Sequence, residues 1–288
     1  MKKIGIVLEG GGMRGIYTAG VLDFFINKNI YFPYVIGVSA GACHALNYLS
    51  GQKGRDKDIA LKFLGDKRYL SFRNLIRTGE IFGFDFIFGE LSEKLLPFDY
   101  KAFEKSKQEL VVGVTNCITG QCEYFYKSKT STYEILKVVR ASSSLPFISK
   151  EVIINGKAYM DGGISSSIPL KKAIDDGCEY NIVVLTRNKG YRKKPSKLTR
   201  NLSKLKYRNF RGLSKAVGER YKKYNSELEF VENMEKEGKV FVIRPQKHIN
   251  VSRVEKDKNK IFQLYKQGYI ETAQIYKDLK KWINSIDN

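Results

Sequence analysis

A serine in a glycine-flanked pentapeptide is the first candidate for covalent chemistry in this chain. The residues Gly37-Val38-Ser39-Ala40-Gly41 fit the pattern G-x-S-x-G, in which a serine sits on a tight turn between a strand and a helix. Both glycines relieve backbone crowding, and the helix N-terminus offers N–H groups to a developing negative charge. The apolar run Tyr34 to Val38 and the helical spacing of apolar residues after the turn predict that context. We therefore interpret Ser39 as a nucleophile rather than a plain turn serine.

A glycine-rich loop follows the first apolar run, Ile4 to Leu8. Its sequence, Gly10-Gly11-Gly12-Met13-Arg14-Gly15, satisfies the dinucleotide fingerprint G-x-G-x-x-G. A dinucleotide site also needs an acidic residue at the end of the second strand, and the Ser39 turn occupies that place. Three consecutive glycines also let backbone N–H groups approach a tetrahedral oxyanion. We favour this oxyanion hole, with Arg14 as a nearby cation that steadies the loop or binds a lipid phosphate.

An aspartate follows a predicted hairpin further along the chain. Asn155-Gly156 is a strong signal for the tight turn of such a hairpin, and Asp161-Gly162-Gly163 comes directly after it. Asp161 is placed to act as a general base toward Ser39, but an Asx-turn residue at a strand end explains the same pattern equally well. The chain has two histidines, His44 and His248. A triad with His248 would suit an α/β-hydrolase, but several strands precede the serine in that fold, so we expect both histidines to be structural.

Taken together and in this order, the three motifs resemble those of the patatin-like phospholipase family. The resemblance covers roughly residues 3–187, and the sequence ASSSLPF at residues 141–147 is similar to a stretch that many members carry before the aspartate. It implies a three-layer α/β/α fold, in which helices cover both faces of a mostly parallel sheet. Residues after about 190 resemble a C-terminal extension of some bacterial members.

The resemblance also implies roles for individual residues. Ser39 is then the nucleophile and Asp161 its base, without a histidine. The amides of Gly11 and Gly12 hold the oxyanion. The predicted oxyanion hole comprises four residues: Gly10, Gly11, Gly12 and Ala40. Lipid esters such as phospholipids or lysophospholipids are the implied substrates. We expect neither a metal ion nor another cofactor, because no cluster of residues has metal-ligand spacing.

Composition and pattern set the broader expectations. The chain has 288 residues, 42% of them hydrophobic, without an uncharged apolar run of 18 residues, so we expect no transmembrane helix. Glu9 ends the first apolar run too early for a signal peptide, which favours a cytoplasmic protein with peripheral membrane contact. The four cysteines match no zinc or CxxC pattern and are expected to be free thiols in a reducing compartment.

The order of predicted elements indicates an α/β protein with two parts. The strand–helix–strand opening predicts a parallel sheet with helices on both faces. We expect a catalytic domain over residues 1–190 and a basic, mainly helical region over residues 191–288, packed on it or extending it. Residues 255–285 read as a pair of helices broken near Gly268. Alternating phenylalanines over residues 82–88 fit either a lid segment or core packing.

A basic stretch accounts for most of the formal net charge of +21. Residues 187–223 hold fifteen Lys or Arg residues and one acid, Glu219, with leucines at helical spacing between them: Leu198, Leu202 and Leu205. We predict a basic amphipathic helix, continuing on one face to residues 208–210, that contacts an anionic membrane. The alternative is a solvated face whose leucines pack on the core. Nucleic acid is not an expected partner, and the oligomeric state is left open.

Two other functions remain open on the sequence alone. The glycine loop leaves a nucleotide-binding oxidoreductase as one alternative. A basic membrane-binding protein without enzymatic activity is the other.

Overall fold

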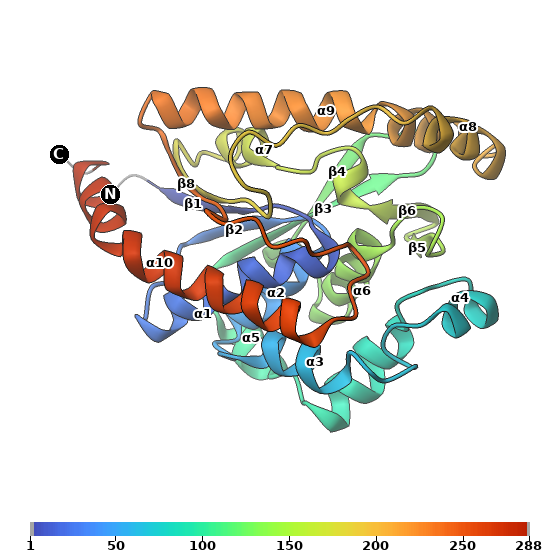
Figure 1. The fold of residues 1–288 in the computed structure, drawn as a ribbon, viewed down its shortest axis with the longest axis horizontal. Coiled ribbons are helices and arrows are strands. Elements are labelled where there is room, and N and C mark those ends of the chain that lie inside the picture. The colour runs from blue at the N-terminus through green and yellow to red at the C-terminus, as the bar shows by residue number, and fades with distance from the viewer. Residues whose placement is uncertain (1–2, 287–288) are drawn as a thin grey trace.

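One mixed sheet organises the described part of the chain (Figure 1). The computed structural model describes residues 3–286. Residues 1, 2, 287 and 288 lie outside the described residues. They belong to the ranges expected for the catalytic domain and the C-terminal region. The strands lie in the order β5-β6-β3-β2-β1-β7-β8, and β4 also pairs with β3. Their bounds are β1 Ile4–Leu8, β2 Tyr34–Gly37, β3 Glu109–Asn116, β4 Cys122–Tyr126, β5 Val152–Ile154, β6 Lys157–Asp161, β7 Tyr180–Val184 and β8 Val240–Ile243.

The strands at the centre of the sheet are parallel. β1 pairs in parallel with β2 and β7, β2 with β3, and β7 with β8, whereas β4, β5 and β6 form the antiparallel pairings. The apolar runs that predicted strands are continuous because central parallel strands are buried on both faces. In β1, Ile6 and Leu8 pack into one core cluster and Val7 into another on the opposite face.

Helices cover both faces of this sheet, as Figure 1 shows. One face carries α1 Ile16–Asn27, α2 Ala40–Leu49, α3 Arg55–Phe63, α5 Tyr100–Lys105, α6 Thr132–Ser143 and α10 Lys258–Ile286. The other carries α7 Leu170–Asp175 and α9 Arg211–Lys236. The remaining helical segments are η1 Gly12–Gly15, α4 Phe72–Thr78, the π-helical η2 Phe86–Leu95, η3 Lys127–Lys129, η4 Gly162–Ile164 and α8 Lys197–Lys206. The three-layer α/β/α fold with a mainly helical C-terminal region is confirmed.

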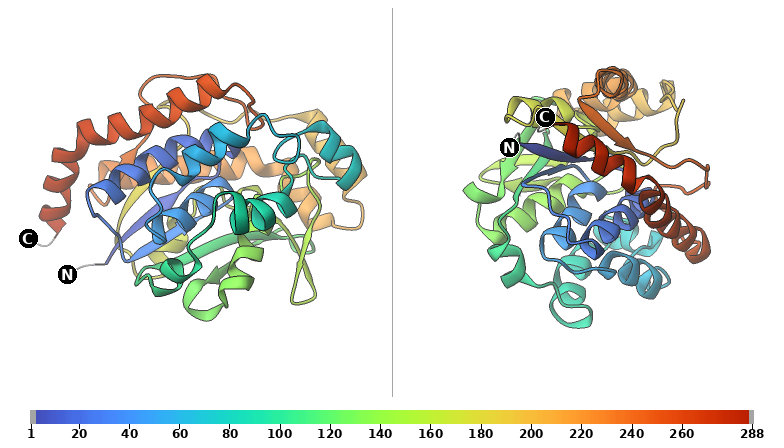
Figure 2. Two further views of the ribbon diagram at one scale, coloured as in Figure 1. Left: turned by 90° about the horizontal axis from the view of Figure 1, so that it is seen from below. Right: turned by 90° about the vertical axis from the view of Figure 1, so that its left-hand side faces the viewer.

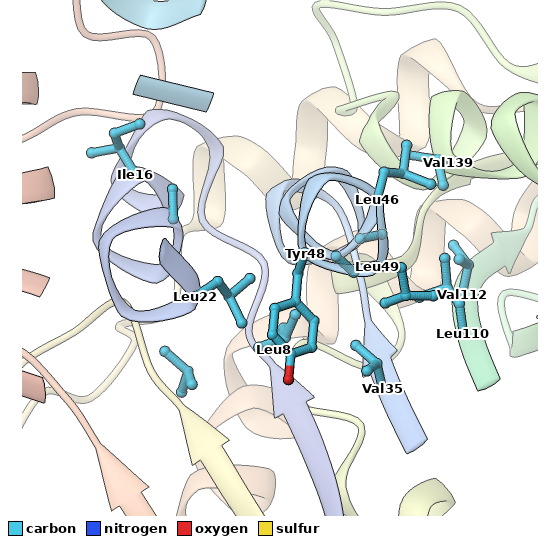
Figure 3. Close-up of a cluster of buried hydrophobic side chains, with 14 of the residues drawn as sticks. Leu8, Ile16, Leu22, Val35, Leu46, Tyr48, Leu49, Leu110, Val112 and Val139 are labelled. Carbon is cyan, nitrogen blue, oxygen red and sulfur yellow. The ribbon is translucent and has the colours of Figure 1, made fainter. Parts of the chain in front are cut away.

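The larger core cluster lies between the sheet and the α2 layer. Figure 3 shows Leu8, Val35 and Val112 of the strands facing Leu46, Tyr48 and Leu49 of α2. Tyr48 is fully buried, and its hydroxyl donates to Ile30 O at 2.8 Å while accepting from Phe32 N–H at 3.0 Å. The α2 helix is therefore fixed against the sheet by both apolar and polar contacts, which positions the turn at its N-terminus.

The C-terminal region joins the same sheet. Its strand β8 pairs in parallel with β7, and its last helix, α10, packs along α1. Among the described residues, no helix is both long and apolar enough to cross a bilayer. The division of the chain at residue 190 stays a prediction.

The expected break near Gly268 is wrong, because α10 runs without interruption from Lys258 to Ile286. Gly268 is needed for close helix packing instead. A Cβ at Gly268 would lie 2.2 Å from Tyr17 O of α1, and one at Gly20 of α1 would lie 2.1 Å from Tyr265 O of α10. Each helix therefore places a glycine against the backbone of the other. The low helix propensity of glycine suggested a break where tertiary packing requires the missing side chain.

We expect Gly268→Ala to destabilise the protein by roughly 1–3 kcal/mol, because the new methyl group overpacks the contact with Tyr17. Helix propensity alone predicts the opposite sign, a gain of about 1 kcal/mol. Urea unfolding measures the difference. Gly65→Ala is the matched control, since a Cβ there meets nothing within 4 Å. A Gly268→Ala protein as stable as the parent would show that the two helices move apart at little cost.

Candidate active site

The G-x-S-x-G segment forms a strained turn between β2 and α2. Ser39 has φ 54° and ψ −129°, a backbone conformation that side chains rarely adopt. A Cβ at Gly37 would lie 2.8 Å from Ala42 N, and one at Gly41 would lie 2.5 Å from Leu8 O. The two glycines are therefore required by the closeness of the backbone on both sides of Ser39.

Ser39 and Asp161 meet although 122 residues separate them. The Ser39 Oγ–H donates to Asp161 Oδ2 at 2.7 Å, and the amide of Gly163 donates to Asp161 Oδ1 at 2.8 Å. Asp161 is the last residue of β6, and its pairing with Val114 of β3 brings it to the strand ends near Ser39. The structure thus places these two predicted site residues in direct contact.

The electrostatics of Asp161 favour a basic carboxylate. Only 1% of the residue is exposed, and this burial raises the pKa of Asp161 above its ordinary value. The charge of Arg220, the hydrogen bond from Ser39 and the charge of Arg253 act in the opposite direction. The carboxylate is therefore more basic than in water, yet supported in its ionised form by two cations and two hydrogen bonds.

Ser142 holds the backbone of Ser39 in place, a role that the sequence motifs did not predict. Its hydroxyl accepts from the Ser39 N–H at 2.8 Å and donates to Gly113 O at 2.6 Å. Both partners are buried, so this one hydroxyl satisfies two backbone groups that water does not reach. The only signal in the sequence was the resemblance of residues 141–147 to a family stretch.

The predicted oxyanion donors divide into two groups. Within the described residues, the amides of Gly11, Gly12 and Ala40 have no hydrogen-bond partner in the protein. The Gly10 amide donates instead to Ser167 O at 3.4 Å. Gly10 is thus placed to hold the loop, and the three unpaired amides are the candidates for an oxyanion. Their roles stay predictions.

An apolar cavity of about 160 Å³ opens beside Ser39. Its wall includes Met13, Ile16, Phe82, Phe84 and Phe88, so the phenylalanine-rich segment contributes directly to the site. Phe82 and Phe84 are also buried in the main core cluster, which means that residues 82–88 belong to the core and to the cavity wall together.

Other reactive side chains near Ser39 are accounted for. Cys43 also borders the cavity, but burial raises its pKa to about 12, so it remains a neutral thiol. His44 lines the cavity and lies with Nδ1 2.9 Å from Asp56 Oδ1. His248 is exposed on the loop after β8. Neither histidine hydrogen-bonds to Ser39 or Asp161 in the described part of the chain.

Helix α9 braces both loops of the site, which the sequence reading missed. Arg220 Nε donates to Gly163 O at 2.5 Å, Tyr224 OH donates to Glu9 Oε1 at 2.9 Å, and Glu227 accepts from the amides of the Ser167–Ile168 segment. These three polar residues recur every three or four positions, so they share one face of the helix. This helical spacing was the signal in the sequence for a helix face that contacts the site. It was not recognised because most residues around it are basic.

The chain is similar to a known protein family over more than half of its length. A model of the patatin-like phospholipases matches residues 6–174, more than half of the chain. The chain belongs to the patatin-like phospholipase family. A domain of unknown function, DUF6363, matches residues 210–284 of this patatin-like chain.

Individual relatives are about a quarter to a third identical to this patatin-like protein over the aligned segments. The uncharacterized protein YjjU of Escherichia coli is 31% identical over 193 residues, which cover 64% of this chain and 52% of YjjU. The probable lipid hydrolase 463L of invertebrate iridescent virus 6 is 26% identical, with 59% of this chain and 62% of that protein covered. The lysophospholipase NTE1 of Meyerozyma guilliermondii is 26% identical over 63% of this chain but only 12% of its own length. The matched segment therefore spans less than two thirds of each relative.

The patatin-like site also contains a buried arginine, Arg14, and no group of metal ligands is found among the described residues. Arg14 is buried, and burial together with the charges of Arg187 and Arg253 lowers its pKa to about 10. No carboxylate pairs with it in the described residues. Among residues 3–286, no three His, Cys, Asp or Glu side chains are grouped as metal ligands, and the four cysteines are free. Independence from metals stays a prediction.

We expect Ser142→Ala to lower stability by about 1–3 kcal/mol, because Ser39 N–H and Gly113 O lose their buried partner. Esterase turnover should fall as well, since the turn that holds Ser39 loses its anchor. Thermal unfolding and kcat measure the two effects. Ser149→Ala is the matched control: Ser149 is equally buried, but its hydroxyl has no partner in the described residues, so its loss should be neutral or stabilising. Equal behaviour of the two variants would remove Ser142 from the support of the turn.

Proposed function

We propose that this protein hydrolyses acyl esters of lipids, with Ser39 as nucleophile and Asp161 as its base. The observation that carries the proposal is the 2.7 Å hydrogen bond from Ser39 Oγ to a buried carboxylate, beside an apolar cavity. Membership of the patatin-like phospholipase family and the lipid hydrolase and lysophospholipase named among its relatives support the same substrate class.

The proposed reaction has two steps that use the same base. Asp161 Oδ2 takes the proton of Ser39 as Oγ bonds to the ester carbonyl carbon, and the amides of Gly11, Gly12 and Ala40 stabilise the oxyanion. The alcohol leaves with that proton, and the acyl group stays on Ser39. Water then gives a proton to Asp161 and attacks the carbonyl carbon of the acyl-enzyme. The bond to Ser39 Oγ breaks, Asp161 returns the proton to Oγ, and the fatty acid is released.

The arrangement argues against a dinucleotide site in the glycine loop. The Met13 amide donates to Arg253 O at 3.1 Å, and a Cβ at Gly12 would lie 2.7 Å from the same oxygen. The Arg253 backbone thus occupies the Met13 amide and the space beside Gly12, which narrows the approach of a pyrophosphate to the loop. The end of β2, at Gly37, is followed by the Ser39 turn and carries no ribose-binding acid.

We also propose that one end of the molecule binds an anionic membrane. Figures 1 and 2 show α4, the β5–β6 hairpin and α8 together at the end opposite the termini, toward which the parallel strands run. This end carries exposed apolar side chains: Phe72, Ile76, Ile153, Leu198, Leu202 and Leu205. Exposed cations lie beside them on α4 and α8: Arg73, Arg77, Lys197 and Lys204. Apolar groups flanked by cations favour an anionic lipid surface.

The structure changes two details of the membrane prediction. Helix α8 ends at Lys206, so residues 208–210 do not continue its face, and Leu213 is buried. The three leucines of α8 do not pack on the core, because Leu198 is 70% and Leu205 is 75% exposed. Lys193, which belongs to the basic stretch, is not part of this membrane-binding end, since its amine lies 4.3 Å from the ring centre of Tyr224.

We expect Ser39→Ala and Asp161→Asn each to reduce hydrolysis of a short-chain ester by about a thousandfold or more, with unchanged circular dichroism. The two residues act as a unit, so the double variant should be little worse than either single one. A fluorophosphonate should label Ser39 in the parent. His44→Ala and His248→Ala are the comparison variants and should keep most activity.

The pH dependence of kcat/KM tests the assignment of Asp161 as the base. Asp161 must be ionised to take a proton, and burial raises its pKa, so kcat/KM should fall as pH falls, with an acid limb above the ordinary range of an aspartate. A loss at His248 as large as at Ser39, or near-normal turnover of Asp161→Asn, would replace the dyad by another mechanism.

We expect Lys197→Gln/Lys204→Gln to weaken binding to anionic vesicles roughly tenfold or more, since each cation near the surface contributes on the order of 1 kcal/mol. Vesicle sedimentation measures it, and parent binding should fall as salt is raised. Lys277→Gln/Lys281→Gln, on exposed positions of α10 near the termini, is the charge-matched control. Hydrolysis of a soluble ester should not change. Equal vesicle binding by both double variants would end the proposal for α8.

A further inference from the structure

Five cations gather beside the Ser39–Asp161 pair, and four of them come from the chain beyond residue 186. We call them the cationic cluster: Arg14, Arg187, Lys193, Arg220 and Arg253. Arg14 belongs to the glycine-loop motif, and Arg187, Lys193 and Arg220 belong to the basic stretch that was predicted to contact a membrane. The members other than Arg14 come from the segment after β7, from α9 and from the loop before α10.

Two members of the cationic cluster touch the loops of the site. The Arg253 carbonyl accepts from the Met13 N–H at 3.1 Å, and its Cβ lies 3.2 Å from where a Cβ of Gly12 would be. Arg220 donates from Nε to Gly163 O at 2.5 Å, two residues after Asp161. The backbone of Arg253 therefore lies against the glycine loop while its charge acts on Asp161, and the guanidinium of Arg220 lies against the aspartate loop.

Two further members are held by aromatic rings. The guanidinium of Arg187 lies 4.5 Å from the ring centre of Tyr191, and Lys193 Nζ lies 4.3 Å from that of Tyr224. The two rings meet edge to face, 5.8 Å apart. Tyr224 follows Arg220 by one turn of α9, which connects these cations to those at the loops. Aromatic faces position cations without neutralising them.

The cationic cluster has few negative charges near it, and none of these lies within ion-pair distance of its members in the described part of the chain. None of its five members forms an ion pair with a carboxylate within 4 Å there. The two nearest carboxylates already have partners: Glu9 accepts from Thr186 and Tyr224, and Asp161 accepts from Ser39. Two occupied carboxylates thus face five basic side chains.

Burial and mutual repulsion disfavour the charged forms of these side chains. Burial, followed by the charges of Arg220 and Arg253, lowers the pKa of Lys193 to about 6, and repulsion by Arg220 is the main cause that lowers the pKa of Arg253 to about 10. Arg14 is buried with an Nε that has no partner in the described residues. Like charges held together without hydrogen-bond partners are characteristic of a site for an anion.

We propose that the cationic cluster is a phosphate-binding subsite, supplied mainly by the C-terminal region, that holds the phosphate of an acyl lipid while its ester lies at Ser39. The proposal rests on the proposed function. The apolar cavity beside Ser39 takes the acyl chain, and the cluster lies around Asp161 and the glycine loop. A substrate with an apolar tail on one side of its ester and a phosphate on the other matches this order.

The free donors of the cationic cluster suit a phosphate group. Arg253 and Lys193 have no side-chain hydrogen bond in the described residues, and Arg220 uses only Nε, which leaves its terminal nitrogens for the ligand. Guanidinium groups bind phosphate oxygens through paired, charge-assisted hydrogen bonds. The subsite therefore favours phosphate-bearing lipids over neutral acylglycerols with the same chains.

Binding to a non-hydrolysing protein tests the subsite separately from catalysis. The full chain with Ser39→Ala is titrated calorimetrically with dihexanoyl phosphatidic acid and with dihexanoylglycerol, both below the concentrations at which they aggregate. Phosphatidic acid should bind more tightly, and Arg253→Gln or Lys193→Gln, added to Ser39→Ala, should weaken its binding about tenfold while leaving that of dihexanoylglycerol unchanged. Lys236→Gln, at the exposed far end of α9, is the control and should change neither.

The outcomes separate this proposal from the proposed function. Equal binding of the two lipids, or unchanged binding in Arg253→Gln and Lys193→Gln, overturns the subsite whether or not the parent hydrolyses esters. Binding of inorganic phosphate without any preference for phosphatidic acid assigns the cluster to a free anion and overturns the lipid subsite. Preference for phosphatidic acid that depends on Arg253 supports it, even if the parent proves inactive on every ester and the proposed function falls.

Discussion

The rest of the site depends on one buried carboxylate, that of Asp161. A carboxylate that is 1% exposed is costly to ionise, and its hydrogen bond to Ser39 is useful only while it stays ionised. The amide of Gly163 and the charges of Arg220 and Arg253 offset that cost. Burial raises the proton affinity of the Asp161 carboxylate. The nearby charges of Arg220 and Arg253 act in the opposite direction and favour its ionised form. The reactivity that we propose for the pair therefore depends on a balance that neither motif contains by itself.

That balance makes the C-terminal region part of the site. Helix α9 reaches Gly163 through Arg220, Glu9 through Tyr224 and the Ser167–Ile168 amides through Glu227. Burial raises the pKa of Glu227 to about 7, so its proton occupancy changes near neutrality while its two amide donors favour the charged form. A catalytic unit cut near residue 190 would lose these contacts and the counter-charge on Asp161. The two parts of the chain are thus joined by electrostatics as well as by the β7–β8 pairing.

Local motifs predicted the fold and the central pair because their demands are steric and short in range. The backbone crowding at Ser39 requires Gly37 and Gly41, and the parallel strands require continuous apolar runs. Arg220 and Arg253 escaped prediction because their roles come from distant partners, and a lysine- and arginine-rich segment gives no sign of which cations turn inward. Gly268 misled for a related reason: whether a glycine ends a helix or permits a close crossing depends on the neighbour across from it.

The crossing of α1 and α10 connects the stability of the fold to the geometry of the site. Helix α1 begins directly after the glycine loop, and α10 begins five residues after Arg253. The reciprocal contacts of Gly20 and Gly268 fix one helix against the other. The bond from Met13 N–H to Arg253 O spans the ends of these same two helices. Any separation of the helices therefore moves Arg253 away from the glycine loop, which loosens the cover of the loop and removes a positive charge from Asp161 at the same time.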